Sequence, residues 1–382
     1  MSINTPNKKV ISLVANGFQN DNRVQRMAES IQEISFDVTI VGWQKGQLKE
    51  REVINNIPVH RIRTKSQKWK RSNKIIGLIQ FIDFCICTIR QYKNFDIWHC
   101  NDFEAFWIGL WAKLFNPKIT LVYDSHEYQK ERLGTPFYVK WVIYWVEKLF
   151  ISKAKIFITV SPGIAKEYQK LYKIRDYCLV RNTPHAMIAN KANIFREKFK
   201  IRSNQKIFLY QGMVAPGRGI ENMIEAFKSR TNDQAVLIIM GQGKIEDWVK
   251  VQIKNSNIIF HHPYVSYQEI PNYTGSADVG LNTAVNNCLN HYYCLPNKLF
   301  EYIQSEIPIL TNNLFDCKSL VEEYVIGSVI QEYTPDGINK AIDGMLTQDL
   351  SVYQQNLKKA KAILHWDEEK KQLQRAYQKL KQ

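Results

Sequence analysis

The sequence lacks the marks of several protein classes. Its 17 glycines and 12 prolines in 382 residues are too few for a collagen-like, mucin-like or linker composition. The seven cysteines form an odd set without a Cys-x-x-Cys pair, which fits neither a disulfide framework nor a zinc ribbon. We therefore expect reduced thiols and no structural metal.

Long hydrophobic runs are also missing. The longest apolar stretch, residues 75–89, is interrupted by Gln80 and Asp83 and falls short of the roughly 20 residues that span a bilayer. The first residues hold only a short apolar run before Asn16 and Gly17, which is too brief for a secretory signal. We therefore expect no transmembrane helix, no signal peptide and a cytoplasmic location.

Acidic residues are in the minority: the sequence has 36 Asp and Glu but 52 Lys and Arg, which gives a formal net charge of +16. This excess favours anionic partners such as nucleic acid, phosphate ligands or acidic lipid surfaces, without choosing among them. The 45% of apolar residues is enough for a folded core, and the length favours two domains over one.

Short β-branched runs alternate with longer segments of helical period, which is the βαβ pattern of a parallel sheet. The expected strands are residues 10–15, 38–41, 97–100, 120–123 and 156–160, then 207–211, 235–240, 258–261, 279–281 and 309–311. We predict an α/β protein with domains 1–185 and 200–365, and an amphipathic helix at 366–382 that packs back onto the first domain. Ligands of such sheets bind beyond the carboxyl ends of the strands, so two facing sheets would enclose a cleft.

Polar residues follow the strands of the first half. The turn after the first strand holds Gly17, Asn20 and Asp21, where a glycine permits close backbone approach and a helix N-terminus offers N–H groups to an anion. A plain strand-to-helix turn explains the same residues. No G-x-G-x-x-G fingerprint is present, which leaves a nicotinamide dinucleotide site with little support.

Two further polar clusters follow strands at 97–100 and 120–123, where substrate-binding groups are expected. Helix capping is the alternative interpretation for either cluster. Neither shows a His-x-x-x-His or Asp-x-Asp spacing, so a metal site has no support. The residues are His99, Asn101 and Asp102 in the first cluster, and Asp124, His126 and Glu127 in the second.

The second half opens with a strand and a glycine-rich turn from Gly212 to Gly219. Arg218 at its apex presents five N–H donors that match phosphate oxygens, although a surface arginine in a loop is the simpler explanation. Gly241 and Gly243 follow the next strand and would let a flat ligand ring lie on the backbone.

Residues 290–302 carry the most informative pattern. Pro296 is typical of a helix start, and Lys298 and Glu301 then share one helix face near its N-terminus. They could form an ordinary ion pair. Alternatively, the lysine meets a phosphate while the carboxylate accepts ribose hydroxyls, the two ends of one nucleotide.

These pieces, in this order, resemble the GT4-type family of bacterial glycosyltransferases (glycosyl transferases group 1). The family has the GT-B fold, with two Rossmann-like parallel-sheet domains facing across a cleft. The resemblance covers nearly the whole chain, and its motifs lie at residues 21–24, 124–127, 161–164, 181–184, 211–220, 277–281 and 296–302.

The resemblance implies a retaining transfer of a sugar from a nucleoside diphosphate sugar, bound mainly by the second domain, to an acceptor held mainly by the first. No metal or other cofactor is implied, because cationic side chains and a helix N-terminus stabilise the departing diphosphate. It implies catalytic roles for His126, Arg218 and Lys298. The implied donor-binding residues are Gly17, Gly212, Arg218, Gly241, Gly243, Asn297, Lys298, Leu299 and Glu301, and the expected acceptor-binding residues are Asn20, Asp21, His99, Asp102, Asp124 and Glu127.

Two positions depart from the family pattern. Tyr293 stands where the first Glu of an E-x7-E signature is usual, and Met213 replaces a frequent arginine. They leave a non-catalytic binding relative open. Two further alternatives are a nucleotide-sugar epimerase of the same fold and, from the net charge, a basic nucleic-acid-binding protein. The last finds no recognisable nucleic-acid module in the sequence, and we expect no nucleic-acid partner.

A basic stretch from Arg61 to Lys74 contains no acidic residue, includes Trp69 and precedes the apolar segment 75–89. Basic residues and amphipathic aromatics both favour an anionic membrane surface, although a core helix at 75–89 beside a solvated basic loop explains the same residues. We therefore expect peripheral attachment to the inner face of the cytoplasmic membrane and a lipid-linked or glycan acceptor for cell-surface polysaccharide or glycolipid synthesis. A second aromatic segment, residues 138–150, is expected to face the interior.

Overall fold

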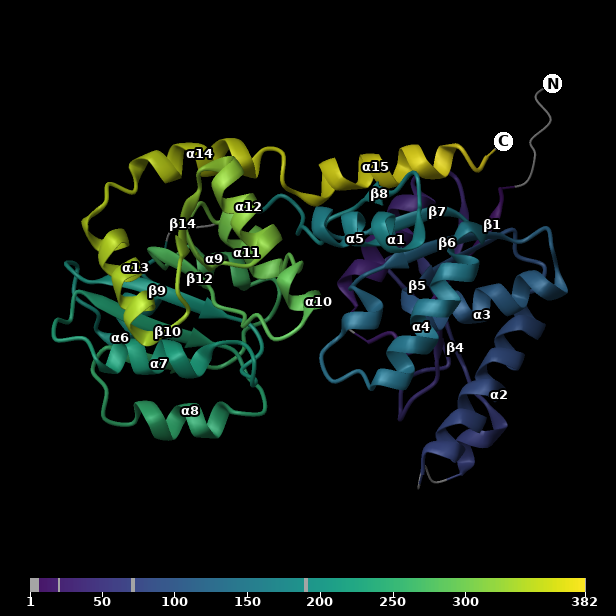
Figure 1. Cartoon of the computed structure of the whole chain (residues 1–382), viewed down its shortest axis with the longest axis horizontal. Helices are drawn as coiled ribbons and strands as arrows, with labels where there is room; N and C mark the ends of the chain where they lie inside the picture. Colours follow the sequence, from purple (N-terminus) through teal and green to yellow (C-terminus); the bar gives the residue numbers. More distant parts are fainter. Residues whose placement is uncertain (1–6, 20, 70–72, 189–191, 382) are drawn as a thin grey trace. The chain divides into compact units, whose positions relative to one another are not determined.

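The computed structural model describes residues 7–19, 21–69, 73–188 and 192–381. It divides into two compact units, one formed by residues 1–180 with 370–382 and the other by residues 181–369. Figure 1 shows that each unit is an α/β layer structure built on its own sheet.

The first unit has an eight-stranded sheet in the order β3-β4-β2-β1-β5-β6-β7-β8. All recorded pairs are parallel except β3 with β4, which form an antiparallel hairpin. The strands are β1 (Lys9–Leu13), β2 (Asp37–Trp43), β3 (Arg51–Ile54), β4 (Ile57–Ile62), β5 (Ile97–Asn101), β6 (Thr120–Ser125), β7 (Ala154–Thr159) and β8 (Cys178–Leu179).

Helices connect these strands. Asp21 caps the first of them, its side chain accepting the N–H of Val24, and Ser161 caps another by accepting the N–H of Ile164. The helical segments are α1 (Asn22–Gln32), η1 (Lys65–Lys68), α2 (Lys74–Tyr92), α3 (Asp102–Phe115), η2 (Gln129–Glu131), α4 (Phe137–Phe150), η3 (Ile151–Lys153) and α5 (Pro162–Tyr172).

The second unit has an entirely parallel six-stranded sheet in the order β11-β10-β9-β12-β13-β14. Counted along the chain, this is the doubly wound order 3-2-1-4-5-6, whose direction reverses between β9 and β12. The strands are β9 (Lys206–Gln211), β10 (Ala235–Met240), β11 (Ile259–His262), β12 (Val279–Asn282), β13 (Ile309–Asn312) and β14 (Gly327–Ile330).

Two apolar clusters cover the faces of this second sheet, as expected for strands buried on both sides. Ile220, Phe227 and Ile338 belong to one cluster, and Leu299, Phe300 and Leu357 belong to the other. The helices are α6 (Ile194–Phe199), α7 (Ile220–Lys228), α8 (Glu246–Ile253), α9 (Ile270–Thr274), α10 (Leu289–Tyr292), α11 (Asn297–Gln304), α12 (Phe315–Tyr324), α13 (Pro335–Thr347) and α14 (Ser351–Lys361).

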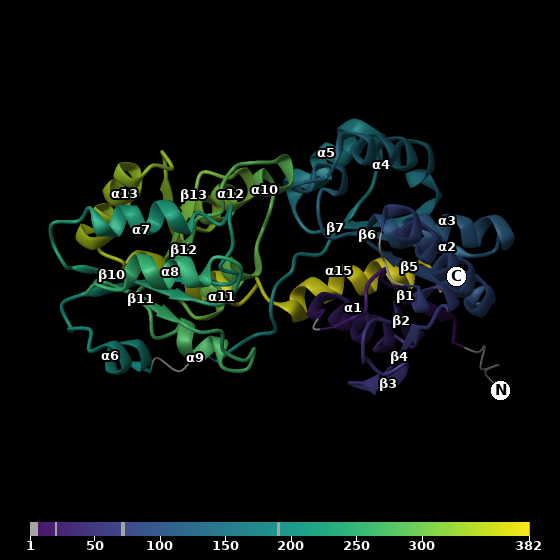
Figure 2. The same ribbon diagram turned by 90° about the horizontal axis from the view of Figure 1, so that it is seen from below.

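The last helix, α15 (Trp366–Gln378), belongs to both units, since the division falls between Glu369 and Lys370. Its later part lies beside α1, where Gln374 donates a hydrogen bond to the backbone oxygen of Ser30 (Figure 2). Whereas we expected the first domain to extend to residue 185, the first unit ends at Val180. The motif 181–184 therefore belongs to the second unit, and Arg181 pairs there with Glu369.

Helix α2 is longer than the apolar run that precedes Arg90. By length and composition alone it could cross a membrane, a test that core helices of soluble proteins also pass. The expectation of no transmembrane helix rests on the apolar run alone and stays a prediction, while the helix extends beyond that run to Lys74 and Tyr92. Its buried side chains pack on the first unit, where Phe84 stacks on Trp43 at a centroid distance of 5.1 Å.

Helix α4 corrects a second expectation. Only Ile143, Val146 and Glu147 are buried, while most aromatic side chains of the segment, including Trp141 at 57% exposure, face outward. The interior-facing interpretation of residues 138–150 is therefore wrong. Spacing shows which side chains share a helix face but not which face is covered, and in α4 the covered face is that of Ile143, Val146 and Glu147.

Candidate functional site

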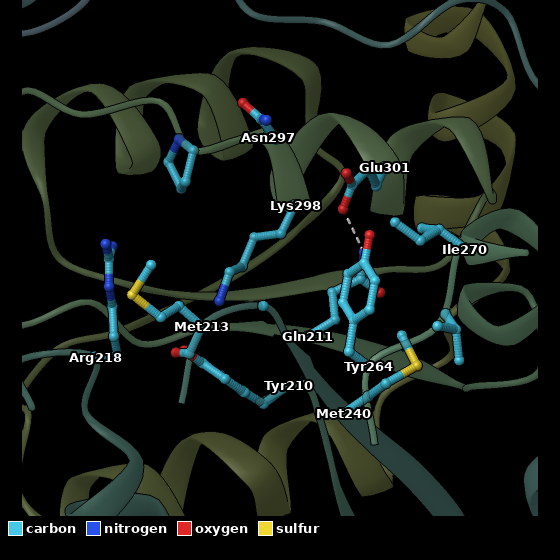
Figure 3. Close-up of a pocket in the computed structure, with 14 residues that line it drawn as sticks. Tyr210, Gln211, Met213, Arg218, Met240, Tyr264, Ile270, Asn297, Lys298 and Glu301 are labelled. Atoms are coloured by element: carbon cyan, nitrogen blue, oxygen red, sulfur yellow. Dashed lines mark hydrogen bonds between the residues drawn. The ribbon is translucent and has the colours of Figure 1, made fainter. Parts of the chain in front are cut away.

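A cavity of about 250 Å³ opens at the carboxyl ends of β9 and β10 in the second unit. We call it the β9 cavity (Figure 3). It lies beside the point where the strand order reverses, which is where open α/β sheets bind ligands. Its lining consists of Tyr210, Gln211, Gly212, Met213, Arg218, Met240, Gly241, Tyr264, Val265, Ile270, Pro296, Asn297, Lys298 and Glu301.

Two glycines shape the floor of the cavity. Gly212 has a φ of +123° and Gly241 a φ of +149°, a backbone region that disfavours other residues. A Cβ on Gly241 would clash with the carbonyl oxygen of Gly212, so the two chain segments approach this closely only without a side chain. The glycines thus bring backbone groups of two strand ends into one site.

Lys298 lies in the first turn of α11 and points into the cavity (Figure 3). Its ammonium sits 3.7 Å from the centroid of the Tyr210 ring, a cation–π contact. Burial and the nearby Arg218 guanidinium lower the pKa of Lys298 to about 7, against the opposing attraction of Glu301. This lysine is therefore poised to gain a proton when an anion binds.

Arg218 belongs to the loop between β9 and α7, and the Thr283 hydroxyl donates a 3.0 Å hydrogen bond to its carbonyl oxygen. Within the described residue ranges, neither Arg218 nor Lys298 forms an ion pair. Figure 3 shows the two cationic groups toward one end of the cavity. Such a pair of cations favours a ligand that carries several negative oxygens.

Glu301 lies one helical turn further along α11. Its carboxylate accepts a hydrogen bond from Nε2 of Gln211, and the amide oxygen of Gln211 in turn accepts one from the Thr274 hydroxyl at 2.8 Å. Figure 3 shows Glu301 and Tyr264 toward the end of the cavity away from Arg218. The cavity therefore has a cationic end and an end with a carboxylate and apolar walls.

Most of the expected donor-binding residues of the second half line this cavity, but two do not. Leu299 is fully buried in the core, because on a helix it points away from its neighbour Lys298. Gly243 is absent from the lining, and a Cβ there would meet the backbone of Val214 instead. Of the two departures from the family pattern, Met213 lines the cavity, whereas Tyr293 packs against Phe315.

Several lining residues escaped the sequence interpretation. Tyr210 and Gln211 end the strand that carries the glycine turn, and Met240 ends the next. Tyr264 follows Pro263 just after β11, a strand-end position that the pattern could have flagged. Ile270 begins the short α9 and has no distinguishing signal in the sequence.

In the first unit, His126 lies between two carboxylates at the ends of β5 and β6. Its Nε2 is 3.1 Å from an oxygen of Asp124, and its Nδ1 is 3.6 Å from one of Asp102. Burial disfavours the imidazolium, but the two carboxylates outweigh it and raise the pKa of His126 to about 9. At neutral pH, His126 is therefore a cation that can donate hydrogen bonds rather than a base.

Asp124 is held from the other side by Arg23, whose guanidinium donates to both carboxylate oxygens at 2.8 and 3.3 Å. Burial opposes ionisation, yet Arg23 and His126 keep the pKa of Asp124 well below its ordinary value. His99 lies 3.5 Å from the same carboxylate and bonds the Tyr377 hydroxyl through Nδ1 at 2.6 Å. Sequence reasoning missed Arg23 as a member of this cluster.

The other residues of the first half that we expected to bind acceptor or donor differ in burial and in their contacts. His99 and Asp124 are completely buried, Asp124 contacting His126 and His99 contacting Asp124, and the acceptor-binding role expected for both stays a prediction. The Asp102 carboxylate, 31% exposed, accepts the backbone N–H of His126, and Glu127 is exposed. The Asp21 side chain caps α1, the carbonyl of Gly17 accepts from Arg61, and Asn20 lies outside the described residues.

Across residues 7–19, 21–69, 73–188 and 192–381, no group of three or more His, Cys, Asp or Glu side chains is placed to hold a metal ion. All seven cysteines are free thiols.

Comparison with known proteins gives matches along the whole chain. The family model of glycosyl transferases group 1 matches residues 191–362, and that of the glycosyl transferase 4-like domain matches residues 21–183. An uncharacterised glycosyltransferase of Methanocaldococcus jannaschii is 22% identical over 342 residues, which are 81% of this chain and 80% of that protein.

Solved structures agree with the sheet topology. The chain is similar to sucrose-phosphate synthase from Thermosynechococcus elongatus, with a TM-score of 0.80, 13% identity, and 98% of this chain and 99% of that chain covered. It is also similar to Anabaena HepE in complex with UDP-glucose, with a TM-score of 0.74, 15% identity and coverage of 97% and 99%.

The prediction of a GT-B fold with two parallel-sheet α/β domains is thereby confirmed. The two family models share the chain between them, each falling largely on one of the two units. The chain belongs to the GT4-type, group 1 glycosyltransferases.

Proposed function

We propose that this glycosyltransferase moves a sugar, with retention of anomeric configuration, from a nucleoside diphosphate sugar to a glycan or lipid-linked acceptor at a membrane surface. The observation that carries the proposal is the pair formed by Arg218 and Lys298, two cations that form no ion pair in the described ranges, at one end of the β9 cavity. A leaving diphosphate is the anion that such a pair suits.

The other end of the β9 cavity suits the nucleoside. Glu301, oriented by Gln211, can accept the ribose hydroxyls, and Tyr264 and Val265 offer apolar surface to a base. The complex of the Anabaena relative with UDP-glucose supports a nucleotide sugar as the donor. Stabilising the diphosphate by side chains that are already in place lowers the barrier to its departure.

We assign the acceptor to the first unit, with His126 beside the reacting sugar. As an imidazolium fixed by Asp102 and Asp124, it stabilises negative charge or donates to a sugar hydroxyl. A retaining transfer at this site therefore does not use His126 as a general base at neutral pH.

Replacing Lys298 by Ala tests the proposal. We expect kcat for transfer to fall about 100-fold, because an electrostatic donor to the leaving group is lost. Release of nucleoside diphosphate is measured with UDP-, GDP- and ADP-sugars and vesicles containing polyprenyl-phosphate-linked sugars. NMR of the anomeric proton of the product determines whether configuration is retained.

The control is Lys340→Ala, which removes an exposed lysine of the second unit that lines no part of the β9 cavity. Equal turnover of the Lys298 and Lys340 variants would remove Lys298 from the mechanism. Isomerised donor without any acceptor would identify an epimerase, and nucleotide binding without turnover would identify a non-catalytic relative.

The surface that we propose for membrane attachment is larger than the basic stretch from Arg61 to Lys74. Arg61 does not contribute, because it is buried and donates to the carbonyl oxygens of Gly17, Phe18 and Lys49, and Lys70 and Arg71 lie outside the described residues. Arg63, Lys65, Lys68 and Lys74 are exposed. Beside them, α2, α3 and α4 pack in sequence and leave large apolar side chains exposed.

A further inference from the structure

A second cavity, of about 620 Å³, lies in the first unit and is used by none of the residues discussed for sugar transfer. We call it the tryptophan cavity. It opens where β2 and β4, which pair in parallel, both reach their carboxyl ends, the edge of the sheet at which α/β proteins bind ligands. Its lining consists of Trp43, Gln44, Lys45, Gly46, Arg63, Thr64, Gln67, Lys68, Trp69 and Gln80.

The walls of this cavity are fixed by a network of hydrogen bonds. Gln80, buried on α2, donates from Nε2 to the carbonyl oxygens of Ser66 at 3.1 Å and Trp69 at 3.0 Å. Asp83, one turn further, accepts from both the N–H and the hydroxyl of Ser66. The loop that carries the cations is thereby tied to α2, so the cavity is preformed.

The charge of the tryptophan cavity is of one sign. Lys45, Arg63 and Lys68 line it without any acidic residue, and in the described part of the chain none of the three forms an ion pair. The neighbouring Asp83 is engaged by Ser66. Three uncompensated cations around one hollow favour a phosphate or carboxylate group, and the Arg63 fork can bind either with two hydrogen bonds.

Aromatic and polar groups complete the recognition surface. Trp43 is held flat against Phe84 at an interplanar angle of 9°, and Trp69 is 54% exposed. Among the described residues, the buried Trp43 Nε1 and Gln44 Oε1 have no hydrogen-bond partner. An unused donor and an unused acceptor beside indole surfaces match the hydroxyls and the C–H face of a sugar ring.

We propose that the tryptophan cavity is an acceptor subsite for an anionic saccharide, a sugar ring that carries a phosphate or a carboxylate. The proposal rests on the proposed function, since it names the chemical class of the acceptor that the first unit holds. The anionic group binds Arg63 and Lys68, and the ring lies against Trp69 with its hydroxyls toward Gln44.

The test is calorimetric titration at low salt with glucose 6-phosphate, glucuronate, glucose and inorganic phosphate. The wild-type chain is first saturated with UDP, which keeps these probes out of the β9 cavity. If UDP does not bind, the double variant Arg218→Ala, Lys298→Ala is used instead, because it lacks the two cations of that cavity. We expect one or both anionic sugars to bind at least about tenfold more tightly than glucose or phosphate, because charge and ring contribute together. The sugar that binds more tightly identifies the anionic group.

Arg63→Ala and Trp69→Ala should each weaken the preferred sugar about tenfold or more, whereas Lys93→Ala, which removes an exposed lysine outside the cavity, should change it less than about twofold. Trp69→Phe, which keeps a ring, should retain part of the affinity. Equal affinity for glucose and the anionic sugars, or binding unaffected by the Arg63 and Trp69 variants, overturns the subsite. UDP binding to the same variants measures the donor site separately. Failure of the acceptor subsite is therefore distinguishable from failure of the proposed function.

Discussion

Lys298 combines a partly buried position with a cationic neighbour, and this makes nucleotide binding depend on pH. With its pKa lowered to about 7 by burial and by Arg218, the side chain is largely neutral at pH 8 in the free protein. A bound diphosphate favours the ammonium, so binding above pH 7 must be accompanied by proton uptake. Below pH 7, Lys298 is already charged and attracts the diphosphate in full. Above pH 7, it must first take up a proton, which weakens binding.

We therefore expect the affinity for UDP to fall between pH 7.5 and 9, approaching about tenfold per pH unit. The diphosphate itself is almost fully ionised in this window, so its own titration contributes little to the change. The Lys298→Arg variant keeps its charge and should show a nearly flat profile, measured by calorimetry. An equally steep decline in that variant would assign the proton to another group.

His126 offers a second test at this scale. Replacing Asp102 by Asn removes one of the two carboxylates that raise its pKa, while an amide oxygen can still accept from the His126 N–H. We expect the pKa of His126 to fall from about 9 toward 6.5, the ordinary value of a histidine side chain. NMR titration of the histidine ring protons measures it, with Asp336→Asn as an exposed control, and an unchanged midpoint would contradict the assignment.

At the residue scale, the sequence identified Lys298, Arg218 and Glu301 because short motifs place them next to glycines and a helix start. It did not identify Arg23 as the partner of Asp124, or Gln211 as the partner of Glu301. These pairs are separated by about a hundred residues, so only the fold brings them together. Spacing within a short motif therefore reveals ligand-facing residues more readily than the distant residues that orient them by hydrogen bonds.

Helix α4 shows how an element can bury a charge while exposing its aromatics. Glu147 is completely buried, and its Oε1 accepts hydrogen bonds from the hydroxyls of Tyr123 at 2.7 Å and Tyr168 at 2.8 Å. These bonds join α4 to β6 and α5. Burial raises the pKa of Glu147, against the lowering effect of the tyrosine hydroxyls.

Glu147→Ala should therefore destabilise the protein by about 2–4 kcal/mol, since two buried hydroxyls lose their acceptor and a void remains. Glu147→Gln, which keeps an acceptor oxygen, should lose less. Lys148→Ala, which removes an exposed lysine that lies over the rings of Tyr144 and Trp145 on the same helix, should change stability by less than about 1 kcal/mol. Urea unfolding followed by circular dichroism compares them, and similar values for the Glu147→Ala and Lys148→Ala variants would refute the role of the carboxylate.

The strand pattern predicted the central parallel strands of both units but not β3, β4, β8 or β14. The β3–β4 hairpin was detectable, because its turn residues Asn55 and Asn56 both adopt positive φ values that asparagine tolerates. Edge strand β14 contains Gly327 and Ser328 and is short, so propensity gives little signal. For α4, the aromatic spacing alone could not tell an interior stripe from an exposed one.

At the scale of the whole molecule, the proposed membrane attachment combines the basic charge with the exposed apolar helices of the first unit. Leu114 and Phe115 at the end of α3 are 79% and 72% exposed, and Ile75 on α2 and Phe137 on α4 are 68% and 82% exposed. Apolar insertion and attraction to anionic headgroups add in membrane binding. The proposed attachment therefore needs both contributions.

We expect the protein to cosediment with phosphatidylglycerol vesicles at low salt and less with phosphatidylcholine vesicles. The double variant Leu114→Ser, Phe115→Ser should weaken this binding about tenfold or more. Val251→Ser, Val352→Ser, which changes exposed valines of the second unit, serves as the matched control. Protein that remains in the supernatant at low salt, or equal binding by both double variants, would refute the attachment surface.

The division of the chain between two units has a consequence for how the protein is made. The first unit is discontinuous in sequence: its body ends at Val180, but the buried Tyr377 that bonds His99 comes from the last residues. During synthesis from the N-terminus, residues 1–180 emerge before the second unit, yet the first unit lacks its final helix until residues 181–369 have also been made. A nascent chain released before residue 370 would leave His99 without the Tyr377 hydroxyl, so early termination should impair the unit that was translated first.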